Sequence, residues 1–158
     1  MAKVKTNAMR ILDRQKVPYE ILSYEVHDGK IDGITVAGKI GKDPAYVYKT
    51  LVAVGASKSL YVFVIPVEAE LDLKKAAKEA GEKKIEMLPV KDIQKFTGYI
   101  RGGCSPIGMK KNYPTFLDAG AAEKDAIIVS AGKIGFQIEL APSELLEATE
   151  GELAEVTK

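Results

Sequence analysis

The stretch YVYKTLVAVGASKSLYVFVIPV, residues 46–67, decides the class of fold. It contains two runs of aliphatic, β-branched and aromatic residues, Tyr46–Val54 and Leu60–Val67, joined by Gly-Ala-Ser-Lys-Ser. Such side chains favour β-strands, and a short connection of small and polar residues is typical of strands that run antiparallel. We therefore predict that these two runs form an antiparallel pair buried in the core.

The segments on both sides of this pair alternate between helical and extended patterns. Helices are predicted at 7–16, with Thr6 as the capping residue and Pro18 as the stop, and at 33–41. Further helices are predicted through Ala80, with Asp72 as the cap and Gly81 as the end, at 90–96 and at 142–148. Strands are predicted at 19–26, 85–88, 126–130 and 136–140, and the acidic tail is expected to fray. We expect one α+β domain over residues 1–158, with a mixed, largely antiparallel and barrel-like sheet flanked by helices.

The composition excludes several classes of protein. A single cysteine, Cys104, excludes an internal disulfide, and with a single histidine, His27, it gives no basis for a metal site or a cofactor. The first residues lack the apolar core of a signal peptide, and no run approaches the ~18 apolar residues of a membrane span. We expect a cytoplasmic protein with no membrane partner.

The net charge of +1 bears on nucleic-acid binding. A protein that binds RNA through its overall field carries a basic excess, because each phosphate it neutralises releases counterions. Any RNA contact must therefore come from local patches, of which there are two candidates: Lys74, Lys75, Lys78, Lys83 and Lys84 in one, and Lys110 and Lys111 in the other. A solvated helix face and a charged loop are the commoner meaning of such runs.

Lys49 is the first candidate for chemistry. It interrupts an apolar strand in which every second side chain can face solvent, and the pattern alone favours an outward lysine because lysine is seldom fully buried. In the alternative, Lys49 points into a pocket. There it would hold a phosphate or neutralise charge on a reacting carbonyl group.

The irregular segment 97–114, TGYIRGGCSPIGMKKNYP, is the second candidate. Within it, Gly102 to Pro106 could place consecutive N–H groups against an oxyanion, or could simply form a turn. The turn Ser130 to Gly135, SAGKIG, is a similar but weaker candidate. Cys104 has no obvious base beside it, and His27 lies in a predicted turn, so a structural thiol and a surface imidazole are the simpler interpretations.

Five stretches occur together in the order and spacing of a known family. They are Val47–Leu51 (VYKTL), Leu71–Ala77 (LDLKKAA), Thr97–Tyr99 (TGY) with Gly102 and Gly103, Ser105–Gly108 (SPIG) with Lys110 and Lys111, and Ser130–Lys133 (SAGK) with Gly135. On these residues the chain resembles the YbaK/EbsC-type aminoacyl-tRNA deacylases, relatives of the editing domain of prolyl-tRNA synthetase. Each stretch alone is a weak signal, and their joint order makes the match specific.

The resemblance implies the fold of that family and an activity, the hydrolysis of the ester in a mischarged aminoacyl-tRNA. It implies that activity depends on Lys49 and on a loop against the ester, Gly102, Gly103, Cys104, Ser105 and Pro106. It further implies that Tyr24, Tyr99, Ser130 and Gly132 bind substrate. The expected substrate is Cys-tRNA(Pro), with the substrate's own thiol taking part in cleavage. The expected partners are the 3′ end of the tRNA and prolyl-tRNA synthetase.

Three positions depart from the family's pattern. Ile134 replaces a common arginine, Gln137 stands where an acidic residue is frequent, and Cys104 occupies a position that is usually aliphatic. These departures leave open an Ala-tRNA(Pro) deacylase. A non-catalytic module that binds a nucleotide or an aminoacyl-adenosine is the other alternative, although the retained Lys49 and glycine loop favour catalysis.

Overall fold

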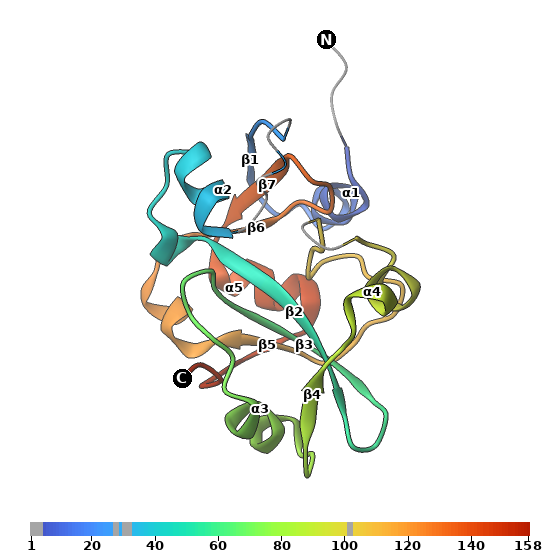
Figure 1. The fold of residues 1–158 in the computed structure, drawn as a ribbon. Coiled ribbons are helices and arrows are strands. Elements are labelled where there is room, and N and C mark those ends of the chain that lie inside the picture. The colour runs from blue at the N-terminus through green and yellow to red at the C-terminus, as the bar shows by residue number, and fades with distance from the viewer. Residues whose placement is uncertain (1–4, 27–28, 30–32, 101–102) are drawn as a thin grey trace.

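The hairpin predicted from residues 46–67 crosses the middle of the molecule (Figure 1). The structure, a computed structural model, describes residues 5–26, 29, 33–100 and 103–158. Strands β2 (Tyr48–Gly55) and β3 (Leu60–Pro66) pair antiparallel, with Val52 opposite Val62. The predicted antiparallel pair is therefore confirmed.

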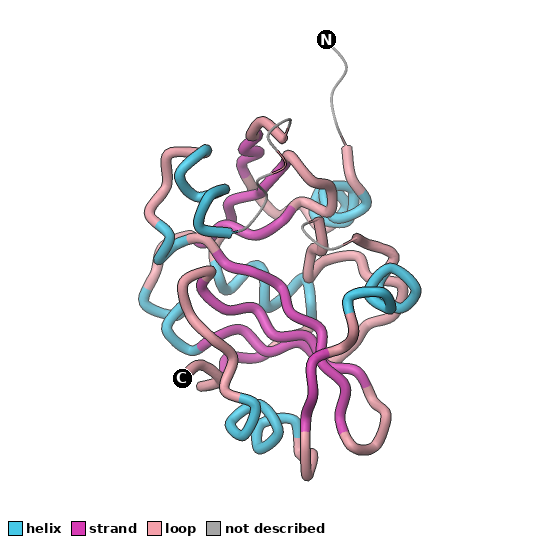
Figure 2. Tube along the Cα trace, in the orientation of Figure 1, coloured by secondary structure: helices cyan, strands magenta, loops and turns pink. Residues whose placement is uncertain are grey.

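Helices and further strands surround this hairpin (Figure 2). The α-helices are α1 (Asn7–Arg14), α2 (Gly33–Lys39), α3 (Leu73–Ala80), α4 (Val90–Thr97) and α5 (Pro142–Thr149), and short 3-10 helices occupy Pro44–Tyr46 and Ala119–Glu123. The other strands are β1 (Glu20–Ser23), β4 (Ile85–Met87), β5 (Thr115–Asp118), β6 (Ile127–Ser130), β7 (Phe136–Leu140) and β8 (Glu152–Ala154). None of the helices in the described part of the chain is both long and apolar enough to cross a membrane.

The strands form two sheets, of order β4-β2-β3-β5-β8 and β1-β7-β6. Antiparallel pairs predominate, and the parallel pairs are β3 with β5 and β5 with β8. The predicted α+β class with a mixed, largely antiparallel sheet is confirmed. The description "barrel-like" is too strong, because in the described residues the two sheets join only at a parallel bridge between Val47 and Ile128. Beyond this bridge β2 pairs with β3 and β4 instead, so the strands do not close into a ring.

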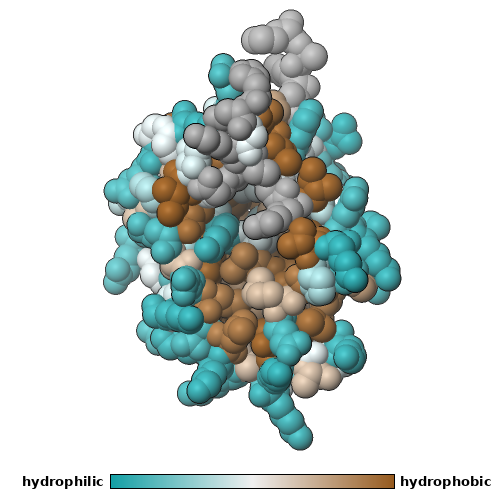
Figure 3. All heavy atoms as spheres, viewed as in Figure 1, coloured by the Kyte–Doolittle hydropathy of each residue, from teal (hydrophilic) through white to brown (hydrophobic). Residues whose placement is uncertain are grey.

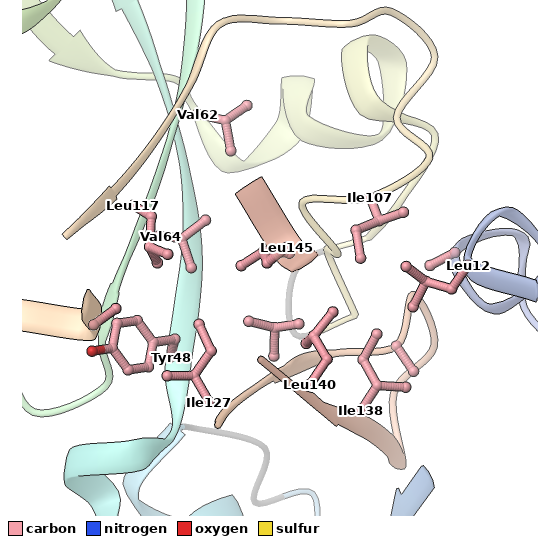
Figure 4. Packing of buried hydrophobic residues seen from close by; sticks show 14 of the residues in the cluster. Leu12, Tyr48, Val62, Val64, Ile107, Leu117, Ile127, Ile138, Leu140 and Leu145 are labelled. Atoms are coloured by element: carbon pink, nitrogen blue, oxygen red, sulfur yellow. The ribbon is translucent and has the colours of Figure 1, made fainter. Parts of the chain in front are cut away.

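The main core lies between the two sheets and helices α1 and α5 (Figure 4). Its side chains come from elements that are far apart in sequence and point toward one another, including Leu12, Val64, Leu117, Ile138 and Leu145. A second cluster on the opposite face of β2 and β3 is covered by α3, and Phe63 there stacks on Phe116 with ring centroids 5.4 Å apart. Both faces of the central hairpin are therefore packed.

Two predicted helix ends are confirmed in detail. The Thr6 hydroxyl accepts a hydrogen bond from the Met9 N–H at 3.2 Å and caps α1. The Asp72 carboxylate accepts bonds from the Lys74 and Lys75 N–H groups at the start of α3. These bonds satisfy N–H groups that have no partner within the helix. Gly81, with φ of 72°, ends α3 in the left-handed conformation.

The expectation that the acidic tail frays is wrong. Strand β8 pairs with β5, Val156 is completely buried, and its carbonyl accepts a 2.7 Å hydrogen bond from the Asp72 N–H. Ala154 and Val156 face the cluster under α3, while Glu152 and Glu155 are exposed. From Leu153 to Val156 the side chains alternate every second residue, so Leu153 and Glu155 face water while Ala154 and Val156 enter the core.

Replacing Val156 with alanine tests this packing. We expect the free energy of unfolding to fall by about 1–3 kcal/mol, because the substitution removes buried methyl groups and leaves a cavity. Chemical denaturation measures the change, and Leu153→Ala, at a residue 41% exposed, is the matched control with an expected change within about 0.5 kcal/mol. Equal effects of the two substitutions would contradict a packed tail.

Candidate active site

Lys49 and Ser130 lie on the same face of two neighbouring strands. Val47, just before β2, bridges Ile128 of β6 in parallel, and both side chains pack in one apolar cluster with Ala37 of α2. Side chains alternate along strands, so the residues two positions further on, Lys49 and Ser130, return to this same face. The bridge therefore brings together two site candidates that are far apart in sequence.

The same face continues across the three-stranded sheet. Ser130 is opposite Gln137 of β7, and Gln137 is in turn opposite Leu22 of β1. Tyr24 follows two residues after Leu22, and its N–H donates to the Gly135 carbonyl at 2.9 Å. The pairing therefore places Gln137, Ser130 and Lys49 level with one another, and it places Tyr24 two residues beyond Leu22 on the same face, diagonally beside Gln137. We call these four residues the polar row.

Lys49 occupies a gap between two apolar clusters. The cluster around Val47 lies on one side, and the cluster containing Ile65, the residue paired with Lys49, lies on the other under α3. Figure 3 shows hydrophobic side chains gathered in the middle of this face, where β2 crosses in Figure 1. Lys49 is half-buried, and its ammonium group makes no hydrogen bond or ion pair with the residues that the structure describes.

Two glycines bring the glycine-rich segments together. A Cβ atom at Gly103 would lie 3.0 Å from the Ile134 backbone nitrogen, and one at Gly132 would lie 2.9 Å from the Tyr99 ring. Gly132 also has φ of 96°, which favours glycine. Because neither position has room for a side chain, the 103–106 loop packs directly against the turn that follows Ser130.

The side chains of this loop maintain its shape. The Tyr99 hydroxyl donates to the Ile107 carbonyl at 2.7 Å, and the Ser105 hydroxyl accepts from the Ile107 N–H at 3.3 Å. Ser105 is completely buried, and Pro106 is buried too. Gly102 and His27 lie outside the described residues.

The backbone N–H groups of the loop differ in their partners. The Gly103 N–H donates to the Ile100 carbonyl at 3.0 Å, so it is not free to meet an oxyanion in this conformation. The N–H groups of Cys104 and Ser105 donate to no atom in the described part of the chain. Both N–H groups belong to the loop that the resemblance places against the ester, so they are the loop's candidates for contacting a ligand.

Cys104 belongs to the wall behind β2. It packs with Val52, Leu88 and Tyr99, and burial raises the pKa of its thiol to about 11. The thiol is therefore protonated near neutral pH, and a protonated thiol is a poor nucleophile.

Gln137 is the residue in the polar row that the sequence did not single out for the site. It stands out in the sequence only as a departure from the family's acidic residue. Its position opposite Ser130 follows from the β6–β7 pairing, which the antiparallel pattern of 126–140 predicts only once the register is known.

The lysines of the two patches are exposed, or bond to backbone carbonyls or to a nearby carboxylate. Lys74, Lys75 and Lys78 are exposed on α3, and the Lys75 ammonium donates to the Thr157 carbonyl at 2.9 Å. Lys84 pairs with Glu86 at 3.0 Å, and the Lys110 ammonium donates to the Lys95 carbonyl at 3.1 Å. These contacts give no specific sign of an RNA site.

The family profile of the aminoacyl-tRNA editing domain matches residues 34–148. EbsC of Enterococcus faecalis (strain ATCC 700802 / V583), whose name describes a proposed Cys-tRNA(Pro)/Cys-tRNA(Cys) deacylase, is 52% identical over 153 residues, covering 97% of this chain and 93% of EbsC.

Two solved structures share the fold. Hypothetical protein APE2540 has a TM-score of 0.88 at 20% identity, covering 97% of this chain and 100% of that one. A structure described as a proposed trans-editing enzyme for prolyl-tRNA synthetase has a TM-score of 0.82 at 21% identity, covering 99% of both chains.

The chain belongs to the aminoacyl-tRNA editing domain family. It is an aminoacyl-tRNA deacylase, a hydrolase whose substrate is the ester between an amino acid and its tRNA.

The raised pKa of Cys104 makes a direct prediction. At pH 8 a pKa of about 11 leaves a thiolate fraction of about 10⁻³, against about a quarter for an ordinary cysteine, so iodoacetamide should label the native protein at least ~100-fold more slowly than a free thiol. Labelling should accelerate as the pH rises toward 11, and Cys104→Ala should retain deacylase activity. Fast labelling of the native protein, with unfolded protein as the control, would contradict the buried position.

Proposed function

We propose that this chain, acting as one domain over residues 1–158, removes cysteine from Cys-tRNA(Pro) in the cytoplasm after prolyl-tRNA synthetase has released the mischarged product. The proposal is supported by the 52% identity to EbsC across nearly the whole of both chains, and by the name of EbsC, which describes a proposed Cys-tRNA(Pro)/Cys-tRNA(Cys) deacylase. A separate hydrolytic site is required because the amino-acid pocket of a synthetase discriminates by only ~1–3 kcal/mol between two amino acids that differ by one small group.

Lys49 carries the proposed chemistry. Its ammonium has no partner among the described residues, and it lies on an apolar face beside Ser130. Hydrolysis of an ester places negative charge on the carbonyl oxygen in the transition state, and a fixed cation in a poorly solvated site stabilises that charge. The N–H groups of Cys104 and Ser105 are suited to the same oxygen, with Gly103 and Gly132 holding the loop in place.

The proposed reaction needs no nucleophile from the protein. Aminoacyl esters are already activated, so positioning and stabilisation of the oxyanion supply much of the rate. Cys104, the single cysteine of the chain, is buried and protonated. A thiol that takes part in cleavage is therefore the substrate's own, which suits cysteine as the amino acid removed.

Prolyl-tRNA synthetase is the proposed partner. The net charge of +1 provides little overall attraction for tRNA, so an enzyme with modest RNA affinity gains tRNA selection from the synthetase. A structural neighbour is itself described as a proposed trans-editing enzyme for that synthetase.

A deacylation time course on Cys-tRNA(Pro) and Ala-tRNA(Pro) tests the proposal. We expect rapid release of cysteine by the wild type and a loss of at least ~100-fold in Lys49→Ala, because the substitution removes the cation from the oxyanion. Lys78→Ala, at an exposed lysine on α3, is the matched control and should keep full activity. Release of alanine alone would identify Ala-tRNA(Pro), and not Cys-tRNA(Pro), as the substrate. No release from either tRNA, even with the synthetase added, would overturn the proposed function in favour of a binding module.

Lys49→Arg separates two roles of the ammonium group. Arginine keeps the positive charge but does not give up its proton, so retention of activity within about tenfold is expected if Lys49 acts by charge. Single-turnover rates across pH 6–9 measure this. A loss as large as that of Lys49→Ala would instead indicate proton transfer or a strict requirement for the lysine's shape.

A further inference from the structure

Two buried polar atoms of the polar row have no hydrogen-bond partner in the described part of the chain: the Gln137 Oε1 and the Tyr24 hydroxyl. Gln137 is only 6% exposed. A buried polar group without a partner costs about 1–3 kcal/mol, so such groups are rare in folded proteins. Two of them on one face of adjacent strands indicate that this place receives a polar ligand group.

The strand register places these atoms at one end of the row and Lys49 at the other. Gln137 is opposite Ser130, and Ser130 is level with Lys49 two residues beyond the Val47–Ile128 bridge. Paired strands lie about 4.8 Å apart, which sets the spacing between Gln137 and Ser130, and the bridge that joins β6 to β2 lies just before Lys49. The Gln137 and Lys49 side chains, which project from the same face, can therefore contact two ends of one small group lying over Ser130.

The two ends of the row have different chemistry. Lys49 supplies a cation, which suits a carbonyl or phosphate oxygen. Gln137 and Tyr24 supply hydrogen-bond acceptors, which suit an N–H donor. In an aminoacyl ester the carbonyl and the α-amino group are bonded to the same carbon, so one ester presents an acceptor for Lys49 and a donor for Gln137 and Tyr24.

The neighbouring charged groups are already engaged. Glu139, two residues after Gln137, lies 3.8 Å from the Lys42 ammonium. The Lys39 ammonium lies 5.8 Å from the centre of the Tyr24 ring and donates to the Glu25 carbonyl at 2.6 Å. The acceptors at this end of the row are therefore the neutral amide and the hydroxyl.

We propose that Gln137, supported by Tyr24, binds the α-amino group of the aminoacyl ester and so orients the carbonyl toward Lys49. This inference rests on the proposed function and adds a specificity residue to it. Because Gln137 is an uncharged amide, it reads the amino group by hydrogen bonding rather than by opposite charge.

The test compares two substrates that differ only in the amino group. They are Cys-tRNA(Pro) and 3-mercaptopropionyl-tRNA(Pro), which keeps the ester and the thiol but lacks the α-amino group. Gln137→Met removes the amide at nearly the same shape. It should lower kcat/KM on Cys-tRNA(Pro) about 10- to 100-fold, mainly through KM, and leave the rate on the amine-free substrate unchanged.

Two further variants keep the test decisive. Tyr24→Phe removes only the hydroxyl and should show a smaller loss confined to Cys-tRNA(Pro), even if Gln137→Met fails to fold. Gln94→Met, at an exposed glutamine of α4, is the matched control and should change neither rate.

Equal losses on both substrates, or no loss on either, would overturn the role of Gln137 while leaving the deacylase intact. A wild type that hydrolyses neither substrate would instead overturn the proposed function. The two failures are therefore distinguishable in one set of measurements.

Discussion

The parallel bridge between Val47 and Ile128 is the constraint on which the site depends. It is the point where the three-stranded sheet meets the five-stranded sheet, and it sets the level of β6 against β2. A shift of one residue at this bridge would turn Ser130 to the opposite face from Lys49, since side chains alternate along strands. The apolar contacts of Val47 and Ile128 with α2 hold that register.

A junction between two sheets is well suited to a hydrolytic site. Both faces of β2 and β3 are packed, so Lys49 is held on a rigid strand rather than on a loop. The loop that faces the turn after Ser130 is anchored by the Tyr99 hydroxyl and by two glycines that leave no space between the segments. The polar groups that carry the chemistry are therefore few, and an apolar surround strengthens their electrostatic effect.

Local patterns predicted most elements, and long-range pairing accounts for the errors. The caps Thr6 and Asp72 and the hairpin of 46–67 follow from residues close in sequence. The tail after residue 150 reads as an acidic, frayed end because its stabilising partners, β5 and the Asp72 N–H, are remote. The barrel-like sheet was overstated for the same reason, because closure depends on how remote strands meet and not on any single strand.

The candidate site, too, could be predicted from the sequence only in part. The sequence by itself determined which residues are available: a lysine in an apolar strand, two glycine-rich segments and one cysteine without a base. Only the tertiary structure decided that Lys49 and Ser130 share a face, that Cys104 is buried with its proton retained, and that Gln137 completes the row. The physical reason is that residue type and period depend on neighbours in the chain, whereas register and burial depend on contacts between strands that are distant in sequence.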